Sequence, residues 1–209
     1  MTIRNKKICW SCLVVLGMSL LFMYMLTSCR GSNYDELKDI PEIVYGGDGK
    51  RDMVTRSKLG YHFNYQRGRN SERIHIPTNV NMFLLDEKYR EVDYTWFRKF
   101  NNWFKDMLYK NNMQALGGNG ETADCDNYAM LYKSLMSAAA YNAGEKTEPA
   151  VLLMLVNQQQ PFGGIPAGGS HLCIMVMTSR GWFVVEPQTG QFDEMRNYPN
   201  QSTVRLLMI

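Results

Sequence analysis

The chain has 209 residues, and its 23 Lys and Arg against 20 Asp and Glu give a formal net charge of +3 at pH 7. Three of the basic residues and none of the acidic ones fall within the first 28 residues, which leaves 20 of each sign in the other 181. That length is enough for one domain with a core of its own. A balanced charge excludes the basic surface on which nucleic-acid binding depends, so we expect no nucleic-acid partner.

The N-terminal segment has the parts of a signal peptide of the bacterial lipoprotein type. Arg4, Lys6 and Lys7 form a basic start, residues 9–26 are almost entirely apolar, and Leu-Thr-Ser then precedes Cys29. Cleavage before Cys29 and lipidation of this residue would anchor the mature chain to a membrane of the bacterial cell envelope, in the periplasm or on the outer-membrane surface. An uncleaved transmembrane anchor stays open as an alternative, because the apolar run approaches the ~20 residues that span a bilayer.

The sequence after the signal peptide (1–28) divides into a tether and a domain. Residues 29–58, which begin at the lipidated cysteine, are mostly polar and carry a glycine-rich middle, as expected of a tether. Residues 59–209 are expected to form the domain. Its first extended segments are predicted at 74–77 and 82–85.

Two amphipathic helices are expected next. Over 86–111, apolar side chains, most of them aromatic, recur at helical spacing between charged ones. This aromatic stripe could form a platform for a sugar, but a stripe with helical period on a charged helix more often faces the core. The second helix is expected over 124–142, with Asp124 as its N-cap and Gly144 as its stop.

Strands dominate the rest of the chain. A continuous apolar run at 150–156 predicts a strand buried on both faces. The glycine-rich loop over 157–170 is either a lid that gates a site or a plain surface excursion. Two further strands are expected at 171–177 and 182–186, and an edge strand at 204–209. Helices followed by a meander of strands predict an α+β fold with an antiparallel sheet.

Cys125 is the candidate nucleophile. It lies in the first turn of the second helix, where free N–H groups and the helix dipole favour a thiolate. Its neighbours Asp124, Asp126 and Asn127 are not the composition of a core. Two flanking carboxylates would raise the pKa of the thiol, so a histidinium partner would have to outweigh them. The alternative is that Cys125 is an inert, half-buried apolar residue.

A cysteine nucleophile needs a histidine base, and the base needs an acceptor that fixes its tautomer. His171 opens an apolar strand directly after the glycine-rich loop, whereas His62 and His75 lie in polar, irregular sequence typical of a surface. Glu186 ends the next strand and is the candidate acceptor. The two side chains face each other if the chain reverses at residues 178–179, and they lie several residues apart if it reverses later.

Cys173 lies two residues after His171 and is expected on the same face of the strand. We interpret it first as a core residue beside the site. A structural disulfide with Cys125, which would abolish the chemistry, is the other interpretation. These two cysteines do not have Cys-x-x-Cys spacing, so no metal site is expected from them.

The candidate residues lie in motifs that resemble a known family. Residues 124–129 (Asp-Cys-Asp-Asn-Tyr-Ala) resemble the Asp-Cys-Asp-Asp-Tyr/Phe-Ala motif of bacterial transglutaminase-like cysteine proteinases. Residues 170–171 (Ser-His) and 181–187 (Gly-Trp-Phe-Val-Val-Glu-Pro) resemble the Gly-His strand and the Trp-x-x-x-Asp-Pro motif of that family. The resemblance covers about residues 111–190. Glutamate replaces the usual aspartate at 186, and cysteine stands at 173 where an aromatic residue is common. Glu-Pro-Gln at 186–188 also resembles the papain-like protease domain of a fungal lectin, which uses a glutamate and calcium.

The resemblance implies a papain-like/transglutaminase-like α+β fold with N-terminal helices packed on an antiparallel β-sheet. It also implies that Cys125 is the nucleophile, that His171 is the base and that Glu186 orients the base. Gln114 precedes the cysteine, as a glutamine of the oxyanion hole does in papain-type enzymes. The backbone N–H of Cys125 is the stronger candidate for that donor.

Two functions are therefore expected as alternatives. The first is a lipid-anchored, thiol-dependent amide-bond enzyme, either a cysteine peptidase or amidase or an acyl transferase, which forms a thioester with a protein or peptide substrate. The second is a catalytically inactive, surface-anchored binding or assembly module on the same fold. The two aspartates beside Cys125, the glutamate at 186 and the many Trp and Tyr side chains favour this second function. No cofactor is expected, although calcium stays open because acidic side chains could meet in space.

Overall fold

The structure is a computed structural model that describes residues 39–46, 53–55, 76–77, 79–86, 88–113 and 124–209. The chain divides into two compact units, Met1–Asp39 and Ile40–Ile209, and the description below concerns the second. The expected signal peptide lies outside the described residues, as do Cys29, His62, His75 and Gln114. None of the described helices combines the length and the apolar character that a membrane crossing requires.

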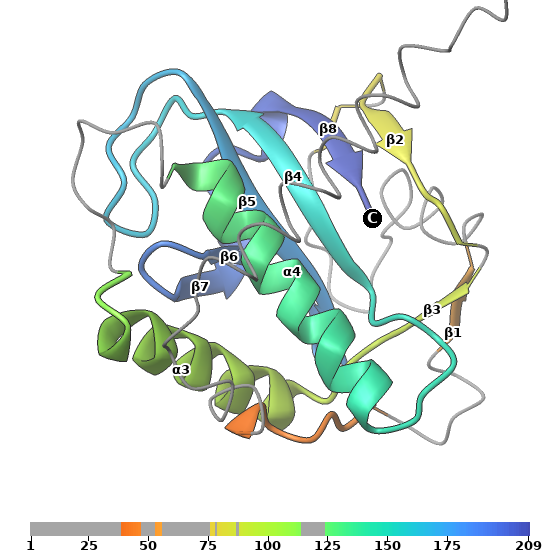
Figure 1. Cartoon of the computed structure of the whole chain (residues 1–209). Coiled ribbons are helices and arrows are strands. Elements are labelled where there is room, and N and C mark those ends of the chain that lie inside the picture. The colour runs from red at the N-terminus through yellow and green to blue at the C-terminus, as the bar shows by residue number, and fades with distance from the viewer. Residues whose placement is uncertain (1–38, 47–52, 56–75, 78, 87, 114–123) are drawn as a thin grey trace, which may run out of the picture. The chain divides into compact units, whose positions relative to one another are not determined.

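A six-stranded mixed sheet forms the centre of this unit (Figure 1). Its strand order is β2 (Asn81–Phe83), β8 (Val204–Met208), β4 (Val151–Asn157), β5 (Ser170–Thr178), β6 (Gly181–Glu186) and β7 (Gln191–Glu194). The strands from β8 to β7 pair antiparallel, whereas β2 runs parallel to β8. A separate antiparallel pair joins β1 (Met53–Thr55) to β3 (Lys88–Arg90).

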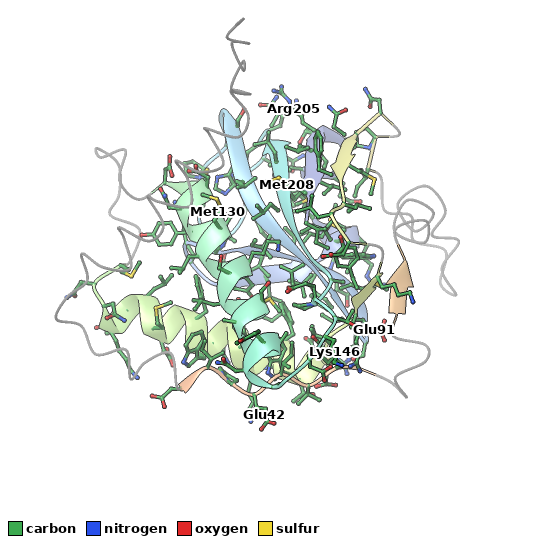
Figure 2. All side chains as sticks on the ribbon, turned by 45° about the vertical axis from the view of Figure 1, so that its right-hand side comes forward. Glu42, Glu91, Met130, Lys146, Arg205 and Met208 are labelled. Carbon is green, nitrogen blue, oxygen red and sulfur yellow. The ribbon has the colours of Figure 1, made fainter. Side chains whose placement is uncertain are left out.

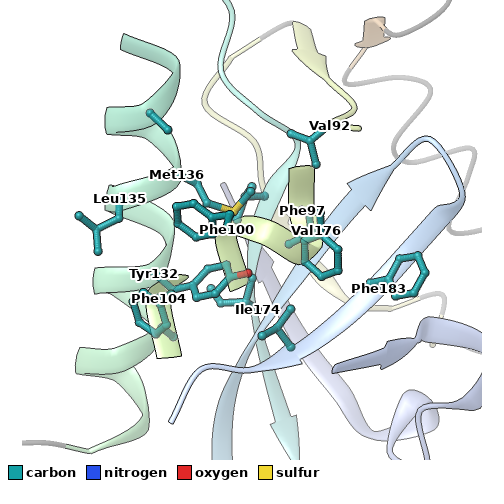
Figure 3. Close-up of a cluster of buried hydrophobic side chains, with 14 of the residues drawn as sticks. Val92, Phe97, Phe100, Phe104, Tyr132, Leu135, Met136, Ile174, Val176 and Phe183 are labelled. Carbon is teal, nitrogen blue, oxygen red and sulfur yellow. The ribbon is translucent and has the colours of Figure 1, made fainter. Parts of the chain in front are cut away.

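Two α-helices occur in the described residues, α3 (Tyr94–Lys110) and α4 (Cys125–Asn142). Their apolar faces and one face of the sheet enclose the first core cluster, in which the rings of Phe100 and Phe104 contact Tyr132 at centroid distances of 5.2 and 4.8 Å (Figure 3). Ile43, which falls in the range expected for the tether, is buried in this cluster. The aromatic stripe of α3 therefore faces the core.

A second core cluster occupies the other face of the sheet. Successive side chains of a strand point to opposite faces, and β5 accordingly contributes Ile174 to the first cluster and Cys173 and Met175 to the second. Strand β5 is thus buried on both sides. The polar exterior is mixed in charge, with Glu42, Glu91 and Lys146 near the end of α4 and Arg205 on β8 (Figure 2).

Local sequence signals placed α4 and the central strands within one or two residues of their observed bounds. The helix expected over 124–142 is α4, with Asp124 at the N-cap. The strands expected at 150–156, 171–177 and 182–186 are β4, β5 and β6. These elements were predictable because a cap residue and continuous apolar runs mark them directly.

Two expectations about elements are wrong. The helix expected over 86–111 begins only at Tyr94, because Asp93 caps it there by accepting the N–H of Trp96 at 2.9 Å. The preceding residues are extended instead, since the backbone of Arg90 pairs with that of Glu148 and Ala150. The segment 204–209, expected at an edge, forms β8 between β2 and β4.

The predicted fold class is also wrong. We expected a papain-like/transglutaminase-like α+β fold with N-terminal helices packed on an antiparallel β-sheet. The described chain is β-rich instead: its sheet is mixed, β2 and β8 run parallel, and the strands outnumber the two α-helices. Parallel pairing of segments that lie more than 100 residues apart depends on long-range contacts, which apolar spacing within a segment does not encode.

The loop between β4 and β5 is tied to the body of the domain. Asn200 accepts the N–H groups of Gln159 and Gln160 at 3.0 and 2.8 Å, and its amide donates to the carbonyl of Gln160 at 2.9 Å. The buried side chain of Gln158 donates to two carbonyl oxygens within the loop. This bonding favours a fixed surface excursion over a lid.

Candidate functional site

The turn between β5 and β6 decides whether His171 and Glu186 meet. Thr178 pairs with Gly181, so the chain reverses between the two positions considered from the sequence. The register of β5 and β6 pairs Ile174 with Val185, so the next residues, Cys173 and Glu186, lie opposite each other. His171 lies two residues from Cys173, on the same face and diagonal to Glu186. Long side chains reach across such a diagonal. His171 Nε2 lies 2.5 Å from Glu186 Oε2.

This ion pair is enclosed by the protein. Glu186 is fully buried and the relative exposure of His171 is 6%. The second carboxylate oxygen of Glu186 accepts the N–H of Gln188 at 3.0 Å. Gly163 of the β4–β5 loop lies against the side chain of Glu186, because a Cβ added at this glycine would be 2.4 Å from Glu186 Cβ. Both oxygens of Glu186 therefore have a partner, and the loop closes over its side chain.

Cys125 is the first residue of α4 and is half-buried. Burial alone would lower the pKa of His171, but hydrogen bonds with Cys125, Cys173 and Glu186 outweigh it and raise this pKa to about 12. The imidazole ring therefore carries its proton at neutral pH. The structure thus brings Cys125, His171 and Glu186 together, while Gln114 lies outside the described residues.

Cys173 and Tyr198 complete the buried group. Cys173 Sγ lies 3.6 Å from Tyr198 Oη, and burial raises the pKa of the Cys173 thiol. Cys125 and Cys173 are both free, so the disulfide alternative is not formed. Sequence reasoning missed Tyr198, because only tertiary packing brings it to β5. The position of Cys173 beside the site was predictable, because it lies two residues after His171 and therefore on the same face of the strand.

A hydrogen bond joins the first turn of α4 to the residues that follow α3. Tyr128 Oη donates to the carbonyl oxygen of Met113 at 2.5 Å, which joins the two helix ends. Tyr109, one turn before Met113, is 68% exposed, and Asp124 and Asp126 are exposed at the start of α4. A hydrogen bond between the two carboxyl groups raises the pKa of Asp126. We call Tyr109, Met113, Asp124 and Asp126 the helix-end surface.

Comparison with known proteins gives matches only among solved structures. No family model matches the sequence, and no curated protein does. The structure of a PSL1a–E64 complex matches with a TM-score of 0.52 and 12% identity, over 75% of this chain and 50% of that one. A structure of Polyporus squamosus lectin bound to the human-type influenza-binding epitope Neu5Acα2-6Galβ1-4GlcNAc matches with a TM-score of 0.51 and 11% identity, over 75% and 49%. At such identities the matches show the fold alone, and this chain spans about half the length of either protein.

These matches correct the predicted function. The fold is shared with lectin structures, and neither match is a structure of a transglutaminase-like protein. The prediction of a lipid-anchored, thiol-dependent amide-bond enzyme is therefore wrong, and with it the assignment as a thiol protease or hydrolase. The binding-module alternative is the one that the matches favour. The physical reason is that a half-buried Cys beside a buried His and Glu can stabilise packing without acting on a substrate.

Neither the described residues nor the matched structures support a signal peptide or a lipoprotein. Both features were assigned to residues that lie outside the described part of the chain. The lipid anchor at Cys29 and a protein or peptide substrate likewise find no support in the matches. The expected lack of nucleic-acid binding stays a prediction.

Proposed function

We propose that residues 40–209 form a binding module and that its ligand is a carbohydrate. The observation that carries this proposal is the helix-end surface, which offers an exposed aromatic ring near the end of α3 and two exposed carboxyl groups at the start of α4, and a hydrogen bond joins these two helix ends. The fold shared with a lectin structure that holds a sugar epitope supports the same ligand class. Its identity is too low to carry any residue of that lectin's site to this chain.

The chemistry of the helix-end surface suits a sugar. The face of a pyranose ring is apolar and packs on an aromatic side chain, and Tyr109 offers such a ring. Sugar hydroxyl groups donate hydrogen bonds to carboxylate oxygens, which Asp124 and Asp126 supply. The exposed Met113 offers a further apolar side chain for contact with a sugar.

The helix-end surface is also held in place, which reduces the entropy lost on binding. The bond from Tyr128 to the carbonyl oxygen of Met113 fixes the end of α3 against α4. The N–H of Asp124 donates to Asn127 Oδ1 at 3.4 Å at the start of α4. The first turn of α4 further contacts the buried His171 through Cys125.

The proposal is tested by glycan-array binding of the full chain in detergent, with Neu5Acα2-6Galβ1-4GlcNAc as the first probe. Tyr109→Ala is expected to weaken binding about tenfold, because ring stacking contributes on the order of 1 kcal/mol beyond its buried area. Tyr141→Ala is the matched control, since Tyr141 is 82% exposed at the other end of α4. That end lies roughly 24 Å from Cys125 at 1.5 Å per residue.

Two results would contradict the proposal. One is a folded protein that binds no glycan on the array. The other is an equal loss of binding in Tyr109→Ala and Tyr141→Ala, which would place the ligand away from the helix-end surface.

We further propose, from the sequence alone, that the module is displayed at the bacterial cell envelope by a lipid on Cys29. Metabolic labelling with a palmitate analogue is expected to label the wild-type chain and to leave Cys29→Ala unlabelled. Membrane association of an unlabelled Cys29→Ala chain would instead favour the uncleaved anchor. A wild-type chain that takes up no label would contradict lipidation.

A further inference from the structure

We propose that His171, Cys173 and Glu186 bind one divalent transition-metal ion of the Zn²⁺ class, in the core beside the start of β5. One ligand atom from each residue lies within 4.8 Å of the other two, and all three residues are buried. This site goes beyond the proposed sugar binding and does not depend on it.

The distances fit a tetrahedral ion after a small adjustment. Zinc bonds of ~2.0 Å to nitrogen and oxygen and ~2.3 Å to sulfur place neighbouring ligand atoms about 3.3–3.5 Å apart in a tetrahedron. The nitrogen of His171 and the oxygen of Glu186, now 2.5 Å apart, would separate by about 1 Å as the ion replaces the proton between them. The Cys173 thiol would release a second proton, so that binding of one ion releases two protons to solvent. The Cys173 sulfur lies within 4.8 Å of both atoms and would move toward them by at most about 1.3 Å.

The donor set selects the class of metal. A thiolate, an imidazole and a carboxylate are the three side-chain ligands that zinc takes in proteins. Calcium and magnesium require mainly oxygen ligands, which the sulfur of Cys173 and the nitrogen of His171 do not provide. Calcium, left open from the sequence, is therefore not the ion that this cluster fits.

Two of the three proposed ligands, Cys173 and Glu186, also contact polar groups of neighbouring residues. Tyr198 Oη lies 3.6 Å from Cys173 Sγ, and the N–H of Gln188 donates to Glu186 at 3.0 Å. Tyr198 is itself fixed by an edge-to-face contact with Phe162 at a centroid distance of 4.8 Å. Such partners orient metal ligands, and their loss commonly costs about 10–100-fold in affinity. The cluster thus has three proposed metal ligands and two further residues, Tyr198 and Gln188, that orient two of them.

Three protein ligands leave a fourth position for water. Cys125 hydrogen bonds with His171 but is not among the three residues whose ligand atoms converge. Since Cys125 and Cys173 are both thiols beside the same ring, they form a matched pair for a test. The geometry points to Cys173, and not Cys125, as the thiolate ligand of the metal.

The experiment uses the full chain in detergent with Cys9→Ser, Cys12→Ser and Cys29→Ser, so that Cys125 and Cys173 are the remaining thiols. Cobalt(II) is added to the reduced protein, and the thiolate-to-cobalt charge-transfer absorption is followed to saturation. We expect one cobalt ion per chain, displaced by an equivalent of zinc. Cys173→Ala is expected to abolish the band, whereas Cys125→Ala is expected to retain it.

Folding is checked separately by circular dichroism and thermal unfolding. If Cys173→Ala does not fold, Tyr198→Phe is used, and it is expected to weaken cobalt binding by about 10–100-fold. The inference is overturned if the folded parent shows no charge-transfer band. It is also overturned if the band disappears in Cys125→Ala, or if it persists at full affinity in Cys173→Ala or Tyr198→Phe. Sugar binding is measured on the same samples, so failure of one proposal is distinguishable from failure of the other.

Discussion

Substitution of Gly163 by alanine tests whether the β4–β5 loop closes over Glu186. Gly163 has a positive φ of +61°, and its neighbour Gly164 has a φ of +82°. Both are in the left-handed region, where an L-residue costs about 1–2 kcal/mol. The two glycines differ in their surroundings, which makes Gly164→Ala a matched control for Gly163→Ala.

The added methyl group has no room at position 163. Its carbon would lie 2.4 Å from Cβ and 2.7 Å from Cγ of Glu186, whereas nonbonded carbons prefer about 3.5–4.0 Å. At position 164 the nearest atom is a methyl carbon of Thr189 at 3.9 Å, which is an ordinary contact. Overpacking of this kind costs about 1–3 kcal/mol. Gly163→Ala should therefore lower the free energy of unfolding by about 2–5 kcal/mol, and Gly164→Ala by about 1–2 kcal/mol.

Urea denaturation followed by tryptophan fluorescence measures both losses. The two variants should keep the wild-type m-value, so that the difference lies in the midpoint. Equal losses in the two variants would refute the reasoning, because they would show that the loop moves away from Glu186 without cost.

Three further predictions concern the groups around this pair. Glu186→Ala is expected to lower the free energy of unfolding by about 3–5 kcal/mol, because it leaves the buried imidazolium of His171 unpaired. A loss below about 1 kcal/mol in urea denaturation would show that the pair is not a buried ion pair. Because the pKa of His171 rises from near 6.5 in the unfolded chain to about 12 in the folded one, its stabilising contribution is complete below about pH 6.5 and is lost as the pH rises toward 12. Urea titrations of the wild type should give a lower free energy of unfolding at about pH 9 than at about pH 6, and Glu186→Ala should show a smaller difference. A free energy of unfolding that rises with pH in the wild type would contradict this prediction. Asn200→Ala is expected to speed hydrogen exchange at the amides of Gln159 and Gln160, which lose their acceptor, whereas Asn200→Asp keeps that acceptor and should protect them. Unchanged exchange in Asn200→Ala would mean that other contacts hold the loop.

Short-range signals determined the elements that surround the candidate site. Asp124 marks the start of α4 and so places Cys125 in its first turn. A continuous apolar run marks β4, and turn residues mark the reversal between β5 and β6. These signals act within a few residues, through capping, backbone preference and apolar spacing. The sequence alone is enough to read them.

The pairing of distant segments was decided by tertiary structure. β2 and β8 lie far apart in the sequence and pair in parallel, which no local pattern specifies. The residues around Arg90 carry a helical apolar pattern, yet they are extended because the backbones of Glu148 and Ala150 offer them hydrogen bonds. Propensity is a weak preference that such contacts override.

The candidate site itself combines both levels. The sequence identified Cys125, His171 and Glu186 as a group, and the structure places them together. The sequence did not determine the register of β5 and β6, the closure of the loop over Glu186, or the approach of Tyr198 to Cys173. It also led to the wrong function, because residue types and order specify which groups can meet but not what reaches them. Burial, register and the shape of the surrounding surface determine that, and all three are set by packing between segments that are distant along the chain.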